Sequence, residues 1–196
     1  MCNLYQMTAT VDEMRKLFGP FEGDRANVAP QDEIYPKMEA PVLRRADDAL
    51  RLDRMEWGFP GPQAAGGRPV TNVRNLASPF WRSALANPER RCLVPVTRFS
   101  EWSAAHDPVT GRKVKHWFGR ADEAPFAFAG LWRPGESRGY YAFLTCAPNE
   151  MVGAVHPKAM PVMLERDEHD QWLNGTVEEA SALARAFPDE KMTQFA

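Results

Sequence analysis

The cysteine at position 2 is the residue whose placement allows the most specific chemistry. If the initiator methionine is removed, Cys2 carries a free α-amine and a thiol on one residue. An α-amine has a pKa of about 7.7–8.0, so much of it is neutral near pH 7 and able to attack a carbonyl carbon. A thiolate on the same residue can then close a ring on that carbon. Cys2 is therefore a candidate nucleophile, and the alternative is an ordinary small residue at a chain end.

Two ionisable side chains are candidates for the accompanying proton transfers. Glu101 lies in the stretch RFSEWSA, at the end of a predicted strand, between Phe99 and Trp102, whose apolar rings would raise its pKa. His156 lies in a predicted tight turn in GAVHPKAMPVML, and imidazole titrates near neutral pH. Each alone fits a solvated glutamate or a turn histidine. Together with Cys2 they form an acid/base pair beside a nucleophile, provided that the fold brings them together.

Asn72 and Arg74, in the stretch VTNVRNLASPFW, are candidates for holding an anion or a base. They lie between a Gly/Pro-rich loop and a predicted helix start. A guanidinium group binds a phosphate through two parallel hydrogen bonds, and an amide both donates and accepts. Side chains at such a place also commonly cap a helix or bind backbone, so both interpretations stand at this point.

Composition limits the kind of protein that can use these residues. The chain has 196 residues, 44% hydrophobic and 26% charged, as expected for one globular domain spanning 1–196. It has no apolar run of about 18 residues and no secretory signal, so we expect a cytoplasmic protein without a membrane partner. Three cysteines and four scattered histidines lack ligand spacing, so we expect neither metal nor cofactor. The formal net charge of −2 means that nucleic acid would require a local basic surface.

The order of the predicted elements indicates the fold class. Capping sequences such as Thr10 with Glu13 predict helices over 11–18, 79–86 and 176–186. Residues 20–41 are predicted to be a long irregular connection. Strands are predicted over 50–54, 92–99, 114–118, 125–132, 140–146 and 160–164. Because strands dominate the middle without regularly alternating with helices, we expect an α+β fold with a curved, mostly antiparallel, barrel-like sheet flanked by short helices. Cys92 and Cys146 lie in strand patterns and are predicted to be buried and inert.

These stretches, in this order, resemble the SOS response-associated peptidase (SRAP) family. The matching pieces are Met1-Cys2, NVAP at 27–30, WGF at 57–59, NVR at 72–74, SEW at 100–102 and VHPKAMPVML at 155–164. Each piece alone is weak, but their combination is specific and spans nearly the whole chain. The resemblance implies a single domain on a curved, barrel-like sheet with helices around it. It maps functional residues onto Cys2, Asn72, Arg74, Glu101 and His156.

The resemblance implies a protein that shields abasic sites in single-stranded DNA through a covalent crosslink. The α-amine of Cys2 would form a Schiff base with the ring-opened sugar aldehyde, and the thiol would close a thiazolidine. Glu101 would position the amine and handle its protons. His156 would protonate the departing sugar hydroxyl and assist reversal of the crosslink.

The expected partner is single-stranded DNA with abasic sites, at replication forks, bound by a monomer that associates with the nucleoid on DNA damage. Asn72 and Arg74 would hold the phosphate or sugar next to the lesion. Trp57 and Trp102 are candidates for stacking on unpaired bases, and core packing is the alternative for both. The arginines that could form a local basic surface are Arg44, Arg45, Arg51, Arg54, Arg82, Arg90 and Arg91.

Two other functions remain open from the sequence. Cys2, Glu101 and His156 can also be drawn as the machinery of a cysteine-dependent peptidase acting on Met1, autocatalytically, or on other peptides. A non-covalent module that binds single-stranded DNA needs none of this chemistry. Replacing Cys2 by Ser separates them, because only the crosslinking function predicts loss of a heat-stable adduct with DNA.

Overall fold

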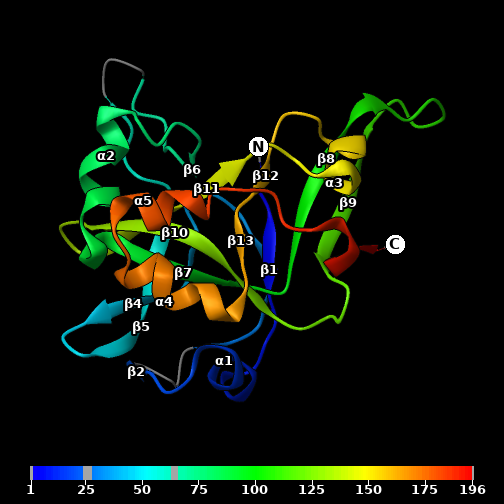
Figure 1. Ribbon diagram of the computed structural model, residues 1–196. Coiled ribbons are helices and arrows are strands. Elements are labelled where there is room, and N and C mark those ends of the chain that lie inside the picture. The colour runs from blue at the N-terminus through cyan, green and yellow to red at the C-terminus, as the bar shows by residue number, and fades with distance from the viewer. Residues whose placement is uncertain (1, 24–27, 63–65, 196) are drawn as a thin grey trace.

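Strands make up most of the chain, and the computed structural model, which describes residues 2–23, 28–62 and 66–195, arranges them in a mixed α+β fold (Figure 1). The strands are β1 (Tyr5–Met7), β2 (Glu22–Gly23), β3 (Gln31–Ile34), β4 (Glu39–Ala46), β5 (Ala49–Trp57), β6 (Asn72–Val73), β7 (Arg91–Val96), β8 (Arg98–His106), β9 (Lys113–Arg120), β10 (Phe126–Pro134), β11 (Gly139–Cys146), β12 (Met160–Pro161), β13 (Met163–Leu164) and β14 (Met192–Phe195). The helices are α1 (Val11–Phe18), α2 (Pro79–Ala86), α3 (Glu150–Val155), α4 (His169–Asn174) and α5 (Val177–Ala182), with short 3₁₀ turns η3 (Pro88–Arg90), η4 (Arg166–Glu168) and η5 (Asp189–Lys191).

The strands form two sheets, and the larger one curls on itself. Its main order is β12-β11-β10-β7-β4-β5-β2, and an additional pairing of β11 with β5 closes part of it into a ring. The smaller sheet has the order β14-β9-β8-β1-β3. Most pairings are antiparallel, the exceptions being β5 and β6 against β11 and β2 against β5. The predicted single α+β domain with a curved, mostly antiparallel sheet is thus confirmed.

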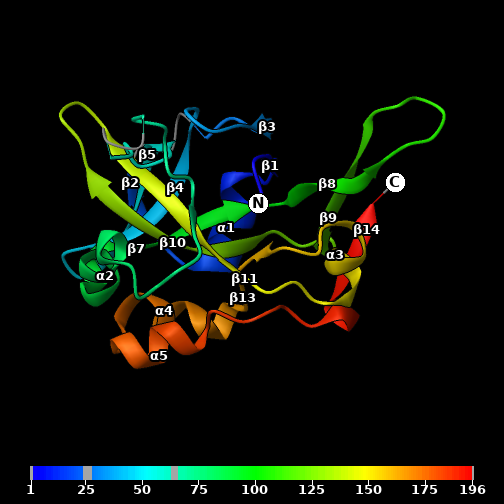
Figure 2. The same cartoon turned by 90° about the horizontal axis from the view of Figure 1, so that it is seen from above.

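The core is an aromatic cluster between the two sheets. Tyr5 from the smaller sheet packs edge-on against Trp57 and Phe143 of the larger one, with ring centroids 5.3 and 6.1 Å apart. Its hydroxyl lies 2.5 Å from that of Tyr141, so each buried phenol has a polar partner. Helices cover the outside of this arrangement, with α4 and α5 together on one side and the β8–β9 hairpin projecting away from the body (Figure 2). The cluster packs β1, the N-terminal strand, against the closed part of the larger sheet.

The predicted helices over 11–18 and 79–86 are confirmed with those bounds, and the third is shorter than predicted. Thr10 and Glu13 form the expected capping box at α1. The third helix, α5, ends at Ala182, not near Ala186. The chain leaves the helix there and buries Phe187 in the core, which the capping sequence at its start does not encode.

Three strand predictions were wrong, and one of them is the strand predicted over 160–164, which is divided at Val162 into β12, paired with β11, and β13, paired with β10. The segment 20–41, predicted to be irregular, contains β2, β3 and the start of β4, because short edge strands carry little hydrophobic pattern. The single strand predicted over 92–99 is two strands, β7 and β8, which belong to different sheets. The change of sheet occurs at Thr97, whose N–H donates to the Gln6 carbonyl at 2.8 Å. The apolar pattern of 92–96 resumes at Phe99 after only Thr97 and Arg98, so the hydrophobic pattern does not show that the strands belong to different sheets.

Candidate active site

Cys2 is held at the start of β1, inside the protein. Its residue is 1% exposed, and its thiol donates to the Leu4 carbonyl at 3.5 Å. The same carbonyl accepts from the Ser100 N–H at 3.0 Å, which fixes the N-terminal segment against β8. Burial, and after it the nearby charge of Glu101, raise the pKa of the Cys2 thiol. The thiol is therefore protonated near neutral pH.

Asn72 fixes the backbone of Cys2 from the larger sheet. It begins β6, which runs parallel to β11, and its Nδ2 donates to the Cys2 carbonyl at 3.1 Å and to Thr71 Oγ1 at 2.8 Å. The Asn72 residue is 7% exposed, and its Oδ1 has no hydrogen-bond partner among the described residues. Asn72 thus orients Cys2 through one end of its amide and leaves a buried acceptor at the other.

Glu101 and His156 meet beside Cys2 from two different elements. Glu101 lies within β8, and His156 is the residue at which α3 ends. Glu101 Oε2 and His156 Nδ1 are 3.8 Å apart, with the Glu101 side chain 3% exposed and that of His156 17% exposed. The chemistry expected of an acid/base pair next to a nucleophile is therefore geometrically available.

Burial sets the protonation states of this pair. It raises the pKa of Glu101 to about 7. It lowers the pKa of His156, helped by the positive charges of Lys158 and Lys113. Both effects favour neutral groups, a protonated carboxyl on Glu101 and an unprotonated imidazole on His156. A carboxyl that titrates near neutral pH can give and take a proton in the same catalytic cycle.

Arg74 and the two tryptophans lie in different surroundings. The exposed Arg74 side chain follows β6, and its guanidinium group donates to the Cys146 carbonyl. Trp57 is fully buried, and its indole N–H donates to the Thr71 carbonyl at 3.0 Å, so core packing is the interpretation that holds for it. Trp102, on β8 next to Glu101, is 38% exposed and has a free ring surface. Of the two tryptophans, only Trp102 can meet an external base.

The local structure differs from the sequence expectation at both acid/base residues. Glu101 was predicted at a strand end, but β8 continues to His106 and places it in the strand interior. His156, predicted in a tight turn, caps the C-terminus of α3, a helix that was not predicted. Cys92 and Cys146 are buried, as predicted. Met1, whose removal is predicted, and Asn27 of the NVAP stretch lie outside the described residues.

Two lysines near the site were not among the predicted site residues. Lys158 and Lys113 are close enough to His156 to lower its pKa. Lys158 lies two residues after His156 in the VHPKAM stretch and could have been singled out from that spacing. Lys113 begins β9, the strand paired with the β8 that carries Glu101, and no local pattern points to it.

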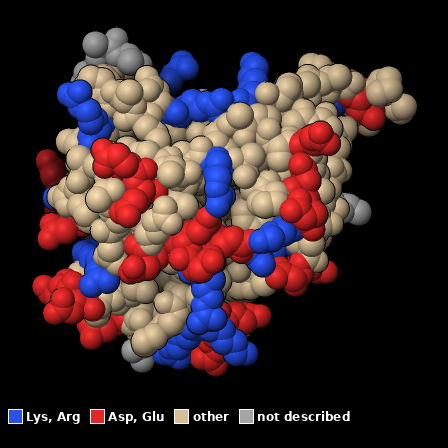
Figure 3. Space-filling view, viewed as in Figure 1, with Lys and Arg blue, Asp and Glu red and all other residues tan. Residues whose placement is uncertain are grey.

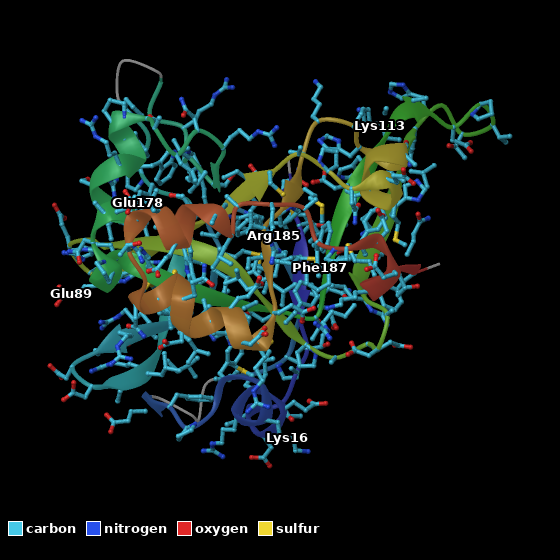
Figure 4. The ribbon with its side chains drawn as sticks, in the orientation of Figure 1. Lys16, Glu89, Lys113, Glu178, Arg185 and Phe187 are labelled. Atoms are coloured by element: carbon cyan, nitrogen blue, oxygen red, sulfur yellow. The ribbon has the colours of Figure 1, made fainter. Side chains whose placement is uncertain are left out.

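Positive side chains gather at the edge of the molecule where the N-terminus lies. In the space-filling view, Lys and Arg lie along the left and middle of the upper edge, Asp and Glu form a band across the middle, and a second group of Lys and Arg lies at the lower end (Figure 3). β6, β12 and α3 lie in the same upper half of the molecule as the N-terminus (Figure 1), and Lys113 lies near the upper edge (Figure 4). A chain with a net charge of −2 thus keeps a local positive surface beside Cys2.

Two further features are absent from the part of the chain that the structure describes. Its helices are all too short or too polar to cross a membrane. Across residues 2–23, 28–62 and 66–195, no group of three or more His, Cys, Asp or Glu side chains is arranged to hold a metal ion.

Comparisons with known proteins show the family to which this chain belongs. The chain is 25% identical over 189 residues to the abasic site processing protein YoaM of Bacillus subtilis, covering 89% of this chain and 79% of that protein. A crystal structure of a Bordetella bronchiseptica protein matches with a TM-score of 0.80 at 22% identity, over 98% of both chains. A Bacteroides thetaiotaomicron crystal structure matches with a TM-score of 0.80 at 21% identity, over 99% of this chain and 91% of that one. The family model described as SOS response associated peptidase (SRAP) matches residues 1–196, so the chain belongs to the SRAP family.

Proposed function

We propose that this protein processes abasic sites in DNA by forming a covalent thiazolidine crosslink through the α-amine and thiol of Cys2. The observation that carries the proposal is the convergence of Cys2, Glu101 and His156, from three separate parts of the chain, at one end of the fold. Family membership and the abasic site processing relative support the substrate class. Removal of Met1, which frees the α-amine, is part of the proposal.

The reaction needs only the two nucleophiles of Cys2 and an aldehyde. The neutral α-amine adds to the aldehyde carbon of the ring-opened abasic sugar and gives a carbinolamine. Loss of one water gives an imine. The thiolate then attacks the imine carbon, a carbon–sulfur bond forms, and the nitrogen takes up a proton. The product contains the protein and the DNA less one water, and the five-membered ring forms readily because both nucleophiles belong to one residue.

Glu101 and His156 supply the proton transfers of this sequence. Protonated Glu101 gives its proton to the leaving hydroxyl of the carbinolamine, and its carboxylate then accepts the proton of the thiol. A pKa of about 7 allows both roles near neutral pH. His156, at 3.8 Å, exchanges a proton with Glu101 and protonates the sugar oxygen when the ring opens. Asn72 keeps the Cys2 backbone in place throughout.

The DNA strand follows the positive edge of the molecule. Arg74 and Lys158 contact phosphates next to the lesion, and Trp102 stacks on a neighbouring unpaired base. A base can reach Trp102 only if it is unstacked from its own duplex, which favours single strands and replication forks. The protein acts as a monomer in the cytoplasm, on nucleoid DNA.

A second candidate is a cysteine-dependent peptidase, which the name of the family favours. A thiol beside an acid/base pair is also the arrangement of a thiol protease, and Met1 is the peptide nearest in sequence to Cys2. This activity is compatible with crosslinking if it serves only to remove Met1. A peptidase acting on other peptides would have no requirement for a terminal cysteine.

The proposal is tested by comparing two oligonucleotides on a denaturing gel. One contains an abasic site, and the other contains a tetrahydrofuran analogue that lacks the aldehyde. We expect a denaturation-resistant band with the abasic strand only, lost in Cys2→Ser and retained in Cys146→Ala, which removes a different buried thiol. Equal retention of both oligonucleotides by gel shift, with no denaturation-resistant band, would instead identify a non-covalent binding module.

A further inference from the structure

The C-terminal segment, residues 187–195, crosses the N-terminus of α3 and binds it through Asp189. One Asp189 carboxylate oxygen accepts from the Met151 N–H at 2.8 Å and the other accepts from the Glu150 N–H at 3.2 Å. The Asn149 side chain accepts from the Val152 N–H at 3.0 Å as the helix cap and donates to the Phe187 carbonyl at 2.9 Å. The first N–H groups of α3 are therefore satisfied from within the helix and from the C-terminal segment.

This attachment matters because α3 ends directly at His156. The His156 N–H donates to the Val152 carbonyl at 2.7 Å, so the imidazole is carried by the last turn of the helix. With only six residues, α3 is too short to be stable on its own. Its position depends on what holds its ends and on its packing against β8. An anchor at the first turn therefore also fixes the imidazole at the last.

The same C-terminal segment is attached to the sheet that carries Glu101. β14 pairs with β9, and β9 pairs with β8, in which Glu101 lies opposite His116. Between η5 and the sheet, the Ala121 N–H donates to the Lys191 carbonyl at 2.9 Å, and Lys191 forms an ion pair with Glu165 at 2.8 Å. Phe187 lies where the segment passes below α3 on its way to the C-terminus (Figure 4). One segment thus joins the helix of His156 to the sheet of Glu101.

We propose that Asp189 is a positioning residue that, by anchoring α3 to the C-terminal segment, holds His156 at working distance from Glu101. The inference rests on the proposed crosslinking function for its catalytic meaning. The inference that Asp189 fixes the position of His156 rests on the contacts described above and does not depend on that function. The charged groups that act on the His156 imidazole are Glu101 on β8, the N-terminal amine, Lys158 after α3 and Lys113 on β9. Asp189 reaches the imidazole only through the helix.

The direct test is an NMR titration of the His156 imidazole in the full-length protein without DNA. The signal is assigned by its loss in His156→Gln. The variants are Asp189→Ala, Asp189→Asn, which keeps one acceptor oxygen, and the control Glu190→Gln, which removes the same charge from the exposed neighbouring residue. Their fold is checked by thermal unfolding. Because no DNA is present, the result does not depend on the proposed function.

The sign of the change in pKa separates positioning from a direct charge effect. Loss of a negative charge alone lowers the pKa of an imidazole. Release of His156 from its buried place raises its pKa toward the ordinary value near 6.5, because burial is what now lowers it. We expect a rise in Asp189→Ala, a smaller rise in Asp189→Asn, and no change in Glu190→Gln. An unchanged or lowered pKa in a folded Asp189→Asn variant would overturn the proposal.

The catalytic consequence is measured separately with the abasic oligonucleotide. We expect Asp189→Ala to slow the crosslinking rate about tenfold or more, because small displacements of a catalytic group have large effects, and to leave affinity for the tetrahydrofuran analogue unchanged. If the His156 pKa rises in Asp189→Ala but the parent protein forms no crosslink, the proposed function fails and the positioning inference stands. If the parent reacts and Asp189→Ala reacts at the same rate, the positioning inference fails alone.

Discussion

Glu101 is a buried carboxylic acid, and its raised pKa makes the free energy of unfolding depend on pH. Its pKa is raised to about 7 in the folded state, against about 4.3 for an unfolded chain. The folded state therefore binds more protons between these two values, and the free energy of unfolding falls as pH rises through that window. The full effect of this residue is about 4 kcal/mol.

Glu101→Gln removes this titration while keeping the shape of the side chain. We expect the variant to be more stable than the parent, with a difference that grows from pH 5 to pH 8 and then levels off. Urea unfolding at a series of pH values measures it, and His156 contributes to both proteins. Glu136→Gln, an exposed substitution on the surface, serves as control and should leave the pH dependence unchanged. A constant difference between Glu101→Gln and the parent across this range would contradict the assignment.

Asn72 is the residue that ties Cys2 to the larger sheet. Asn72→Ala leaves the Cys2 carbonyl without its amide donor, so we expect a loss of about 1–3 kcal/mol in stability together with slower crosslinking. Asn75→Ala is the matched control, because Asn75 is exposed and its side chain accepts a local hydrogen bond from the Ala77 N–H. Denaturing gels and urea unfolding give both quantities. An Asn72→Ala protein that crosslinks at the parent rate would show that this hydrogen bond has no role in orienting Cys2.

At the scale of elements, β8 performs two tasks through the alternation of its side chains. Glu101 points into the protein, and Trp102, the next residue, points outward. Trp102→Ala should weaken binding of single-stranded DNA by about 1–3 kcal/mol, because one stacking surface is lost, with little effect on stability. Fluorescence anisotropy with the tetrahydrofuran analogue measures it, and Val109→Ala at the hairpin tip is the control. Equal affinities for the Trp102 and Val109 variants would exclude stacking at Trp102.

The elements also show what sequence patterns can and cannot predict. The capping box at Thr10 and the proline after Ser78 predict α1 and α2 with correct bounds, because both signals are local. The break at Thr97 was not predicted because β7 and β8 belong to different sheets, and this depends on tertiary packing. α3 was missed as well, since its six residues depend on Asp189 from the far end of the chain. The candidate site residues were singled out by residue type and then by the family resemblance, and the 3.8 Å approach of Glu101 to His156 could be seen only in the fold.

At the scale of the whole molecule, the proposed binding of DNA requires a local positive surface, because the net charge is −2, and the positive edge beside Cys2 is the surface that we propose. Each phosphate contact to a single strand contributes about 0.7 to the slope of log affinity against log salt concentration. Arg74→Ala should therefore lower that slope by about 0.7. Lys16→Ala makes the same change of charge at the opposite end of the molecule (Figure 4) and should leave the slope unchanged. Equal slopes for the two variants would place the DNA elsewhere on the surface.

The most direct test of the account is the intact mass of the purified protein before and after mixing with an abasic single-stranded oligonucleotide. We predict a starting mass that lacks Met1, followed by an increase equal to the mass of the oligonucleotide less one water. Cys2→Ala should abolish this increase, and Cys146→Ala should retain it. A protein that has lost Met1 and forms no adduct, or a Cys2→Ala variant that still forms one, would contradict crosslinking through the terminal cysteine.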